Sequence, residues 1–227
     1  MTQDKHNLKV DWCSHEAAKY ACLHWHYSKT IPTGKPSRLG VWENSNFIGT
    51  VFFGSGASAA LGKPYGLKNN EVCELVRVAL TSHQNFVSKI IAISIRKLKK
   101  ANPGLNLIVS FADPFQGHCG GIYQAGNWIY NGDSSPSHMY LLSNGELAHP
   151  RRFSGSGWNA PKKIPLGAKK IKVPGKHRYL MPLNKKMRKQ ILPLSKPYPK
   201  RSKQAMDDTP VITAKGQNLS ERSKEVA

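Results

Sequence analysis

The spacing of apolar residues predicts two amphipathic helices in the first half of the chain. Residues 14–27 place four apolar side chains on one helical face, and Ser14 is a residue type that caps helix N-termini. Residues 86–101 carry a second apolar stripe and run into an Asn-Pro-Gly sequence that stops helices. Shorter helices are predicted over residues 117–125 and 184–191.

Shorter apolar runs have the length and alternation of β-strands. Residues 39–42 and 47–54 flank a short polar turn, which is the pattern of a hairpin. Residues 71–80 alternate, residues 105–111 form the continuous apolar run of a buried strand, and another strand begins at residue 128. Because strands and helices alternate along the chain, we expect an α/β (or α+β) fold with a central mixed sheet flanked by helices.

The composition changes after about residue 150, where Pro, Gly and Lys dominate. We therefore expect a folded domain over residues 1–150, a basic extension over 151–201 and a disordered tail over 202–227. The first part holds 14 Lys and Arg against 9 Asp and Glu, whereas residues 151–227 hold 20 against 4. The whole chain of 227 residues has a formal net charge of +21.

A charge this positive and this uneven predicts a polyanionic partner, most commonly nucleic acid. A membrane is the rival partner, but it usually requires an amphipathic or lipidated anchor that we do not find. The four cysteines are far apart, without a C-x-x-C pair, and the chain starts without an apolar leader, so we expect a cytoplasmic protein. The predicted nucleic-acid contacts are Lys35, Arg151, Arg152, Lys162, Lys163, Lys169, Lys170, Arg178, Lys200 and Arg201.

Candidate chemistry gathers after the predicted strand 105–111. Asp113 follows its carboxyl end, where catalytic groups collect in open α/β sheets, although such a residue can equally cap the next turn. The glycine-rich stretch 117–121 precedes Tyr123 and could offer backbone amides to a phosphate, although it matches no established phosphate-binding motif.

Two further features are charged or titratable residues in unusual places. Glu74 and Arg77 both occur in the apolar strand 71–80, and simple alternation sends them to opposite faces. His24 and His26 flank Trp25, and one of them could join Asp113 or His118 in a metal site of the kind that suits iron.

Several of these segments together resemble the Mom family of phage DNA-modification proteins. The resemblance rests, in order, on WHYSK at 25–29, PTGK at 32–35, GVWE at 40–43, FIGTV at 47–51, CELVRVAL at 73–80, SFAD at 110–113 and GGIYQAGNW at 120–128. It covers about residues 12–145, and the set is specific although no single segment is.

The resemblance implies an acetyltransferase-like (GNAT) fold over residues 1–150 and a transferase that converts adenine in DNA to an N6-carbamoylmethyl derivative, which shields phage DNA from restriction. It also implies that strands 71–80 and 105–111 diverge to hold the group donor. The residues carried over are Arg77, Ser88, Asp113 and Tyr123 as the catalytic centre, Val78, Leu80, Ser88 and Lys89 as the cofactor contacts, and His26 and Tyr27 as ligands of Fe(II).

On this interpretation the partner is double-stranded DNA whose target adenine leaves the stack, and a homodimer is possible. Acetyl-CoA is the donor that the fold implies, but residues 81–89 lack the glycine-rich loop of such enzymes, so an aminoacyl-tRNA donor stays open. Two other functions also stay open: an N-acetyltransferase acting on a protein or small amine, and a DNA-binding protein without catalysis.

Overall fold

The computed structural model describes residues 7–32, 34–56, 58–153 and 164–200. Seven of the described strands form one mixed sheet with the order β1-β2-β3-β4-β5-β10-β6. The neighbours in this sheet are antiparallel except β4 and β5, which run parallel. Its strands are β1 (Leu8–Trp12), β2 (Ser37–Glu43), β3 (Asn46–Gly54), β4 (Val72–Leu80), β5 (Leu107–Ala112), β6 (Ile129–Asp133) and β10 (His177–Pro182).

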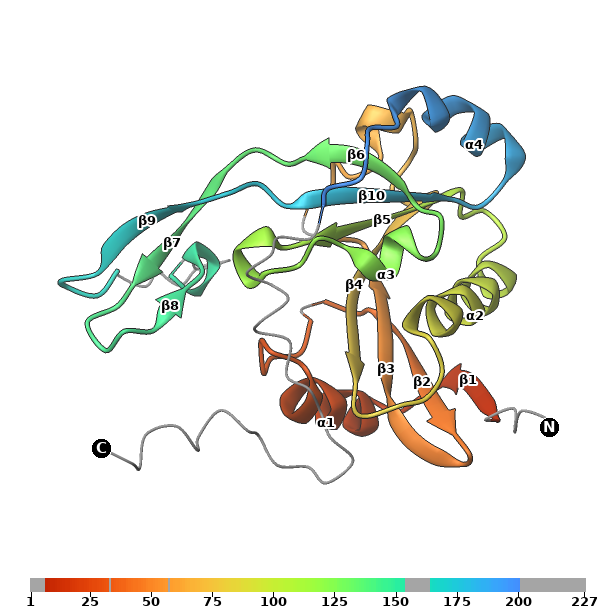
Figure 1. The fold of residues 1–227 in the computed structure, drawn as a ribbon, viewed down its shortest axis with the longest axis horizontal. Helices are drawn as coiled ribbons and strands as arrows, with labels where there is room; N and C mark the ends of the chain where they lie inside the picture. Colours follow the sequence, from red (N-terminus) through yellow and green to blue (C-terminus); the bar gives the residue numbers. More distant parts are fainter. Residues whose placement is uncertain (1–6, 33, 57, 154–163, 201–227) are drawn as a thin grey trace.

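Helices cover both faces of this sheet, as the alternating pattern requires (Figure 1). α2 (Val87–Ala101) packs its apolar stripe on the face that includes Phe53, and α1 (His15–Trp25) packs on Phe52, the neighbouring residue that points to the other face. The remaining helical segments are η1 (Lys63–Tyr65), η2 (Pro114–Gln116), α3 (Gly121–Gln124), η3 (Pro150–Arg152), α4 (Lys185–Ile191) and η4 (Leu192–Leu194). The predicted α/β architecture with a central mixed sheet is therefore confirmed.

The local signals in the sequence are also present in the structure. The Ser14 side chain accepts a hydrogen bond from the Ala17 amide and caps α1. Asn44 and Ser45 both have positive φ and make the turn of the β2–β3 hairpin, because this backbone twist matches that of the paired strands. Among the helices of the described part of the chain, none is long and apolar enough to span a bilayer.

β4 and β5 diverge midway along their length. Residues Val72–Leu75 pair with Leu107–Ser110, whereas the second half of β4 pairs only with β3 in the described structure. The register of β3 and β4 also shifts here, since Phe52 lies opposite Arg77 and Phe53 lies opposite Leu75. This β-bulge at Val76 bends β4 where it leaves β5.

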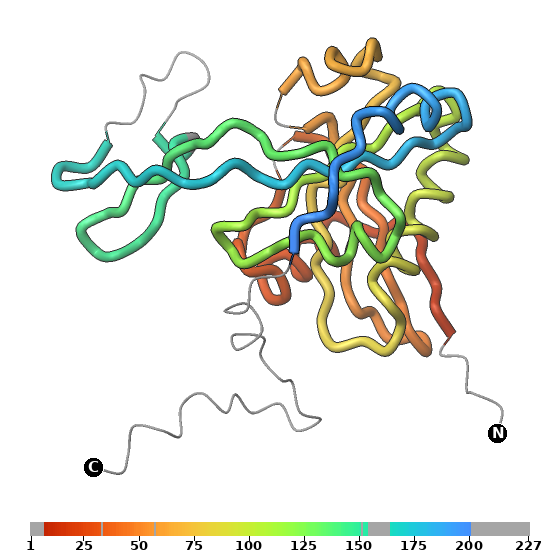
Figure 2. Tube along the Cα trace, turned by 45° about the horizontal axis from the view of Figure 1, so that its top comes forward, coloured from red at the N-terminus to blue at the C-terminus, as the bar shows by residue number. Residues whose placement is uncertain are grey.

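A second, three-stranded sheet projects from the body of the molecule (Figures 1 and 2). It contains β7 (Ser137–Leu141), β8 (Leu147–Ala148) and β9 (Lys169–Val173), in the order β8-β7-β9. We call residues 134–150 and 164–176 the β-arm. The β-arm leaves the main sheet after β6 and returns to it at β10.

The domain boundary predicted at residue 150 needs a correction. β10 lies between β5 and β6, and Met187 and Ile191 of α4 are buried in the core beneath it, so part of the basic extension completes the main fold. The composition predicted too early an end of the folded domain, because lysine-rich flanks surround the short apolar run of β10. The predicted disordered tail, residues 202–227, lies outside the described residues.

Candidate active site

Buried hydroxyl groups form a hydrogen-bond chain at the point where β4 and β5 diverge. Ser110, fully buried in β5, has its Oγ 2.8 Å from the Leu75 carbonyl oxygen and 2.8 Å from the Tyr123 hydroxyl. A carbonyl only accepts and a hydroxyl has one proton, so we assign a chain in which Tyr123 donates to Ser110 and Ser110 donates to Leu75. This chain connects α3 to β4 through β5.

Tyr123 is placed by the turn before α3. Gly120 adopts a φ of 81°, and a Cβ built there would lie 2.3 Å from the Tyr179 ring, so the close approach of this turn to Tyr179 requires glycine. Burial is the main cause that raises the pKa of Tyr123 to about 12, and the hydrogen bond with Ser110 opposes the shift. The phenol is therefore neutral at physiological pH.

Arg77 lies on the α1 side of the sheet because of the bulge. Val78 and Leu80 pack on the α2 side together with Leu75, so alternation is interrupted between Leu75 and Val78. Val72 faces the α1 side of the sheet, and by alternation Glu74 faces it too. Arg77 approaches Cys22 of α1 on this same side. The prediction that Glu74 and Arg77 face opposite sides is thus wrong, because it assumed an unbroken strand.

The Arg77 guanidinium is half-buried with incomplete hydrogen bonding. Its Nε and Nη1 atoms are buried and have no hydrogen-bond partner among the described residues. Burial lowers the pKa of Arg77, while Cys22 and Tyr27 act in the opposite direction. Buried donors without acceptors are costly, so a bound group with acceptor oxygens would be stabilised at this point.

The residues that follow α1 line the same region. Tyr27, 57% exposed, has its ring 4.3 Å from that of His26 and 5.5 Å from that of His118, which precedes α3. Arg77 and His118 both contribute to lowering the pKa of His26, and Tyr27 raises the pKa of Tyr123. We call Arg77, His26, Tyr27, His118, Ser110 and Tyr123 the cleft cluster.

The model of the Mom protein family matches residues 7–200, which include the entire cleft cluster. The chain belongs to the Mom family. A curated relative, the methylcarbamoylase mom of Escherichia phage Mu, is 28% identical over 204 residues, covering 85% of this chain and 84% of the relative.

Solved structures with a similar outline are acyl-transferring enzymes. A Bacillus subtilis acetyltransferase in complex with CoA has a TM-score of 0.46 at 14% identity and covers 79% of this chain and all of that one. An N-acyl amino acid synthase from uncultured soil microbes has a TM-score of 0.47 at 10% identity and covers 83% of this chain and 96% of that one. The fold of this Mom protein is described by its own strand order, β1-β2-β3-β4-β5-β10-β6.

The predicted iron ligands of this Mom protein do not fit a metal site. The Ser28 amide donates to His26 Nδ1 at 3.1 Å, so the proton of the neutral ring is on Nε2 and neither nitrogen has a free lone pair. The described residues also contain no group of three or more His, Cys, Asp or Glu side chains arranged to hold a metal ion. The Fe(II) prediction is therefore not supported, and no step is assigned to iron.

His26 gives the protein a specific pH dependence. Burial first, then Arg77, His118 and Lys29, lowers the pKa of His26 from its ordinary value of 6.5 to about 4. The unfolded chain therefore binds a proton at a higher pH than the folded one, and stability is lost as the pH falls from 6.5 towards 4.

We expect the urea midpoint of the wild-type protein to fall over this range more steeply than that of His26→Gln. The His15→Gln variant, on an exposed part of α1, serves as the control. Equal slopes for wild type and His26→Gln between pH 4 and 6.5 would show that His26 titrates normally.

Asp113 has the capping role that the sequence allowed, together with an ion pair. Its side chain accepts a hydrogen bond from the Phe115 amide at 3.1 Å and caps η2. Its Oδ2 lies 2.9 Å from Lys176 Nζ at the end of the β-arm. The Asp113 carboxylate therefore links the end of β5 to the β-arm.

The loop before α2, where a CoA pyrophosphate was expected, already holds an internal carboxylate. Buried Glu43 accepts hydrogen bonds from the amides of Gln84 and Asn85, each at 2.8 Å, and from Asn85 Nδ2 at 2.6 Å. Lys89 Nζ donates to Asn85 Oδ1 at 2.7 Å. These residues do not fit a pyrophosphate, because the amides are taken and a negative charge lies beside them.

Of the other predicted cofactor contacts, Val78 and Leu80 are half-buried side chains of β4, and Ser88 is half-buried in the first turn of α2.

Glu43 and Ser110 were absent from the predicted site. The only sign of Ser110 in the sequence is a hydroxyl inside the apolar run of β5.

Glu43→Gln should destabilise the protein by about 1–3 kcal/mol, because an amide cannot accept all of these hydrogen bonds and its NH₂ would face a donor. Urea unfolding measures this, with Glu146→Gln as the control. Glu146 makes an exposed ion pair with Arg152, and such pairs contribute at most about 1 kcal/mol. Equal losses in the two variants would show that Glu43 does not organise the loop.

The predicted nucleic-acid contacts fall into three groups. Lys169 and Lys170 are exposed in the β-arm, and Lys35 and Lys200 are exposed elsewhere. Arg152 pairs with Glu146, Arg178 lies 5.8 Å from the Phe111 ring, and the backbone of Arg151 belongs to η3. Lys162, Lys163 and Arg201 lie outside the described residues.

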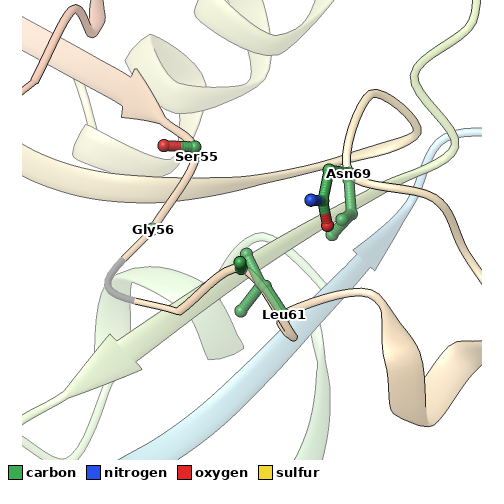
Figure 3. A pocket seen from close by; sticks show the side chains of 6 residues that line it. Ser55, Gly56, Leu61 and Asn69 are labelled. Atoms are coloured by element: carbon green, nitrogen blue, oxygen red, sulfur yellow. The ribbon is translucent and has the colours of Figure 1, made fainter.

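A pocket opens between the segment that follows β3 and the segment before β4 (Figure 3). Its volume is about 290 Å³, and it is lined by Ser55, Gly56, Ala59, Leu61, Asn69 and Val72. Gly56 has a φ of 78°, and a Cβ there would lie 2.7 Å from a carboxylate oxygen of Glu74. Its volume is near the lower end of small-molecule sites, roughly 300 Å³, and its lining offers polar groups.

Proposed function

We propose that this protein is a DNA-modifying transferase that places a carbamoylmethyl group on the N6 amine of adenine and so protects phage DNA from restriction. The observation that carries the proposal is that Tyr27 interacts electrostatically with both the incompletely bonded Arg77 and Tyr123 of the Tyr123–Ser110 chain, in a member of the Mom family. The phage Mu relative named a methylcarbamoylase supports the kind of group transferred.

The substrate adenine has to leave the base stack to be modified. Its amine lies inside the duplex, and an enzyme reaches such an atom by flipping the nucleotide out.

The donor is a carrier that bears an activated carbamoylmethyl group. The N6 lone pair forms a bond to the methylene carbon, and the bond from that carbon to the carrier breaks with its electron pair on the leaving atom. N6 becomes cationic and loses one proton, while the leaving atom gains one. An acetyl group contains no nitrogen, so acetyl-CoA alone does not supply the amide. The tRNA donor and the homodimer stay predictions.

Two side chains of the cleft cluster, together with Asp113, have distinct roles in this step. Arg77 binds oxygen atoms of the donor and stabilises negative charge that develops on them. Tyr123 breaks its hydrogen bond to Ser110 and gives its proton to the leaving atom, and its high pKa keeps it protonated until then. Asp113 takes the proton from N6, and a carboxylate suffices because the alkylated nitrogen is already cationic. Exchange with solvent then restores both groups.

Restriction of plasmid DNA tests the proposal. DNA from cells that express the protein should resist endonucleases whose sites contain adenine, and DNA from cells that express Arg77→Met should be cut. Complete cutting of the wild-type sample, with the folded protein present in the cells, would contradict the proposed function. Proteins or small amines that are acetylated in these cells, and not in cells without the protein, would instead favour the acetyltransferase alternative.

A further inference from the structure

The β-arm presents two chemically different faces. Lys170 lies opposite Tyr140, and Lys172 lies opposite His138, in the β7–β9 register. Directly opposite residues share a face, so these four side chains form one surface, which we call the lysine–aromatic face. The other residues of the two strands, Ser137, Met139, Leu141, Lys169, Ile171 and Val173, turn to the other face, which is mostly apolar.

The lysine–aromatic face combines exposed cations with fixed rings. Lys170 and Lys172 are exposed. The Tyr140 ring packs edge-on against His138 at 5.4 Å and against Phe153 at 5.7 Å. Aromatic rings between lysines are typical of surfaces that contact nucleic acid.

The charge of the β-arm is almost entirely positive. Its acidic residue is Glu146, which is paired with Arg152. Lys169, Lys170 and Lys172 extend along β9, and Lys176, the last residue of the β-arm, makes the ion pair with Asp113. The lysines of the β-arm therefore extend from Lys176, beside the end of β5, outwards along β9, in the sheet that projects from the body of the molecule (Figures 1 and 2).

We propose that the lysine–aromatic face of the β-arm binds the backbone of duplex DNA beside the target adenine. This inference rests on the proposed function, because it assumes that DNA is the substrate. The positive charge of the lysine–aromatic face complements the DNA phosphates, and a β-ribbon is narrow enough to follow a groove of the duplex. A five-residue strand spans roughly 17 Å, so the β-arm covers about five base pairs on one side of the flipped base.

Salt-dependent DNA binding tests the β-arm. The variant Lys170→Ala/Lys172→Ala removes two cations from the lysine–aromatic face. The control Lys185→Ala/Lys189→Ala removes two exposed cations from α4, so the net charge of the two proteins is equal. Fluorescence anisotropy with a labelled duplex is measured at several KCl concentrations for both variants and for the wild type.

The β-arm variant should lose close to two units of the slope of log K against log[KCl], and roughly tenfold or more of its affinity near 0.1 M salt. The α4 control should keep the wild-type slope. Equal losses in the two variants, or no loss in the β-arm variant, would overturn the inference while the restriction result still supported the function. A wild-type protein that neither binds duplex DNA nor protects it would overturn both.

Discussion

Arg77→Met is expected to lose DNA modification by roughly 10²–10³-fold while the protein unfolds at the same or a higher urea concentration. The loss is expected because a fixed donor that stabilises developing charge typically contributes that much to the rate. Stability should hold or rise because Nε and Nη1 of Arg77 are buried without acceptors, and an apolar side chain removes this cost.

The measurement combines nucleoside analysis with urea unfolding of the same preparations. Arg96→Met is the matched control, since Arg96 is exposed on α2, and this variant should keep both modification and stability. If Arg77→Met instead unfolded at much lower urea and its folded fraction modified DNA normally, Arg77 would be a structural residue without a role in the reaction.

Tyr123→Phe is expected to lower modification by roughly 10²–10⁴-fold, the usual contribution of a positioned proton donor. The cost in stability should be only about 1 kcal/mol, because Ser110 retains its hydrogen bond to the Leu75 carbonyl. Modification and urea unfolding are measured side by side.

Tyr179→Phe provides the matched control for this variant. Tyr179 is equally buried, packs against Tyr123 and donates its hydroxyl hydrogen bond to the Cys119 carbonyl. Its loss should cost similar stability with little change in modification per folded molecule. Equal activity losses in both variants would indicate that the tyrosine cluster supports the fold and that Tyr123 transfers no proton.

The parts of the fold that could be predicted from the sequence are those fixed by local signals. The Ser14 cap, the polar turn between β2 and β3 and the apolar stripe of α2 each act within a few residues. β1 and β10 were not predicted, because both are short strands whose place depends on partners far away in the sequence.

The candidate site could be predicted only as a set of residue types. Arg77 and Tyr123 were identified, and the structure places both near the divergence of β4 and β5. The bulge at Val76, which decides the face of Arg77, leaves no pattern in the sequence. The ion pair between Asp113 and Lys176 and the hydrogen bonds of Glu43 join distant residues, so spacing could not reveal them.

Mass spectrometry of deoxynucleosides tests the central claim most directly, since it identifies the group that the cleft transfers. DNA from cells that express the wild-type protein should contain deoxyadenosine heavier by one carbamoylmethyl group, and the Arg77→Met and Tyr123→Phe samples should contain almost none. Unmodified deoxyadenosine alone in the wild-type sample, from cells that contain the folded protein, would contradict the account.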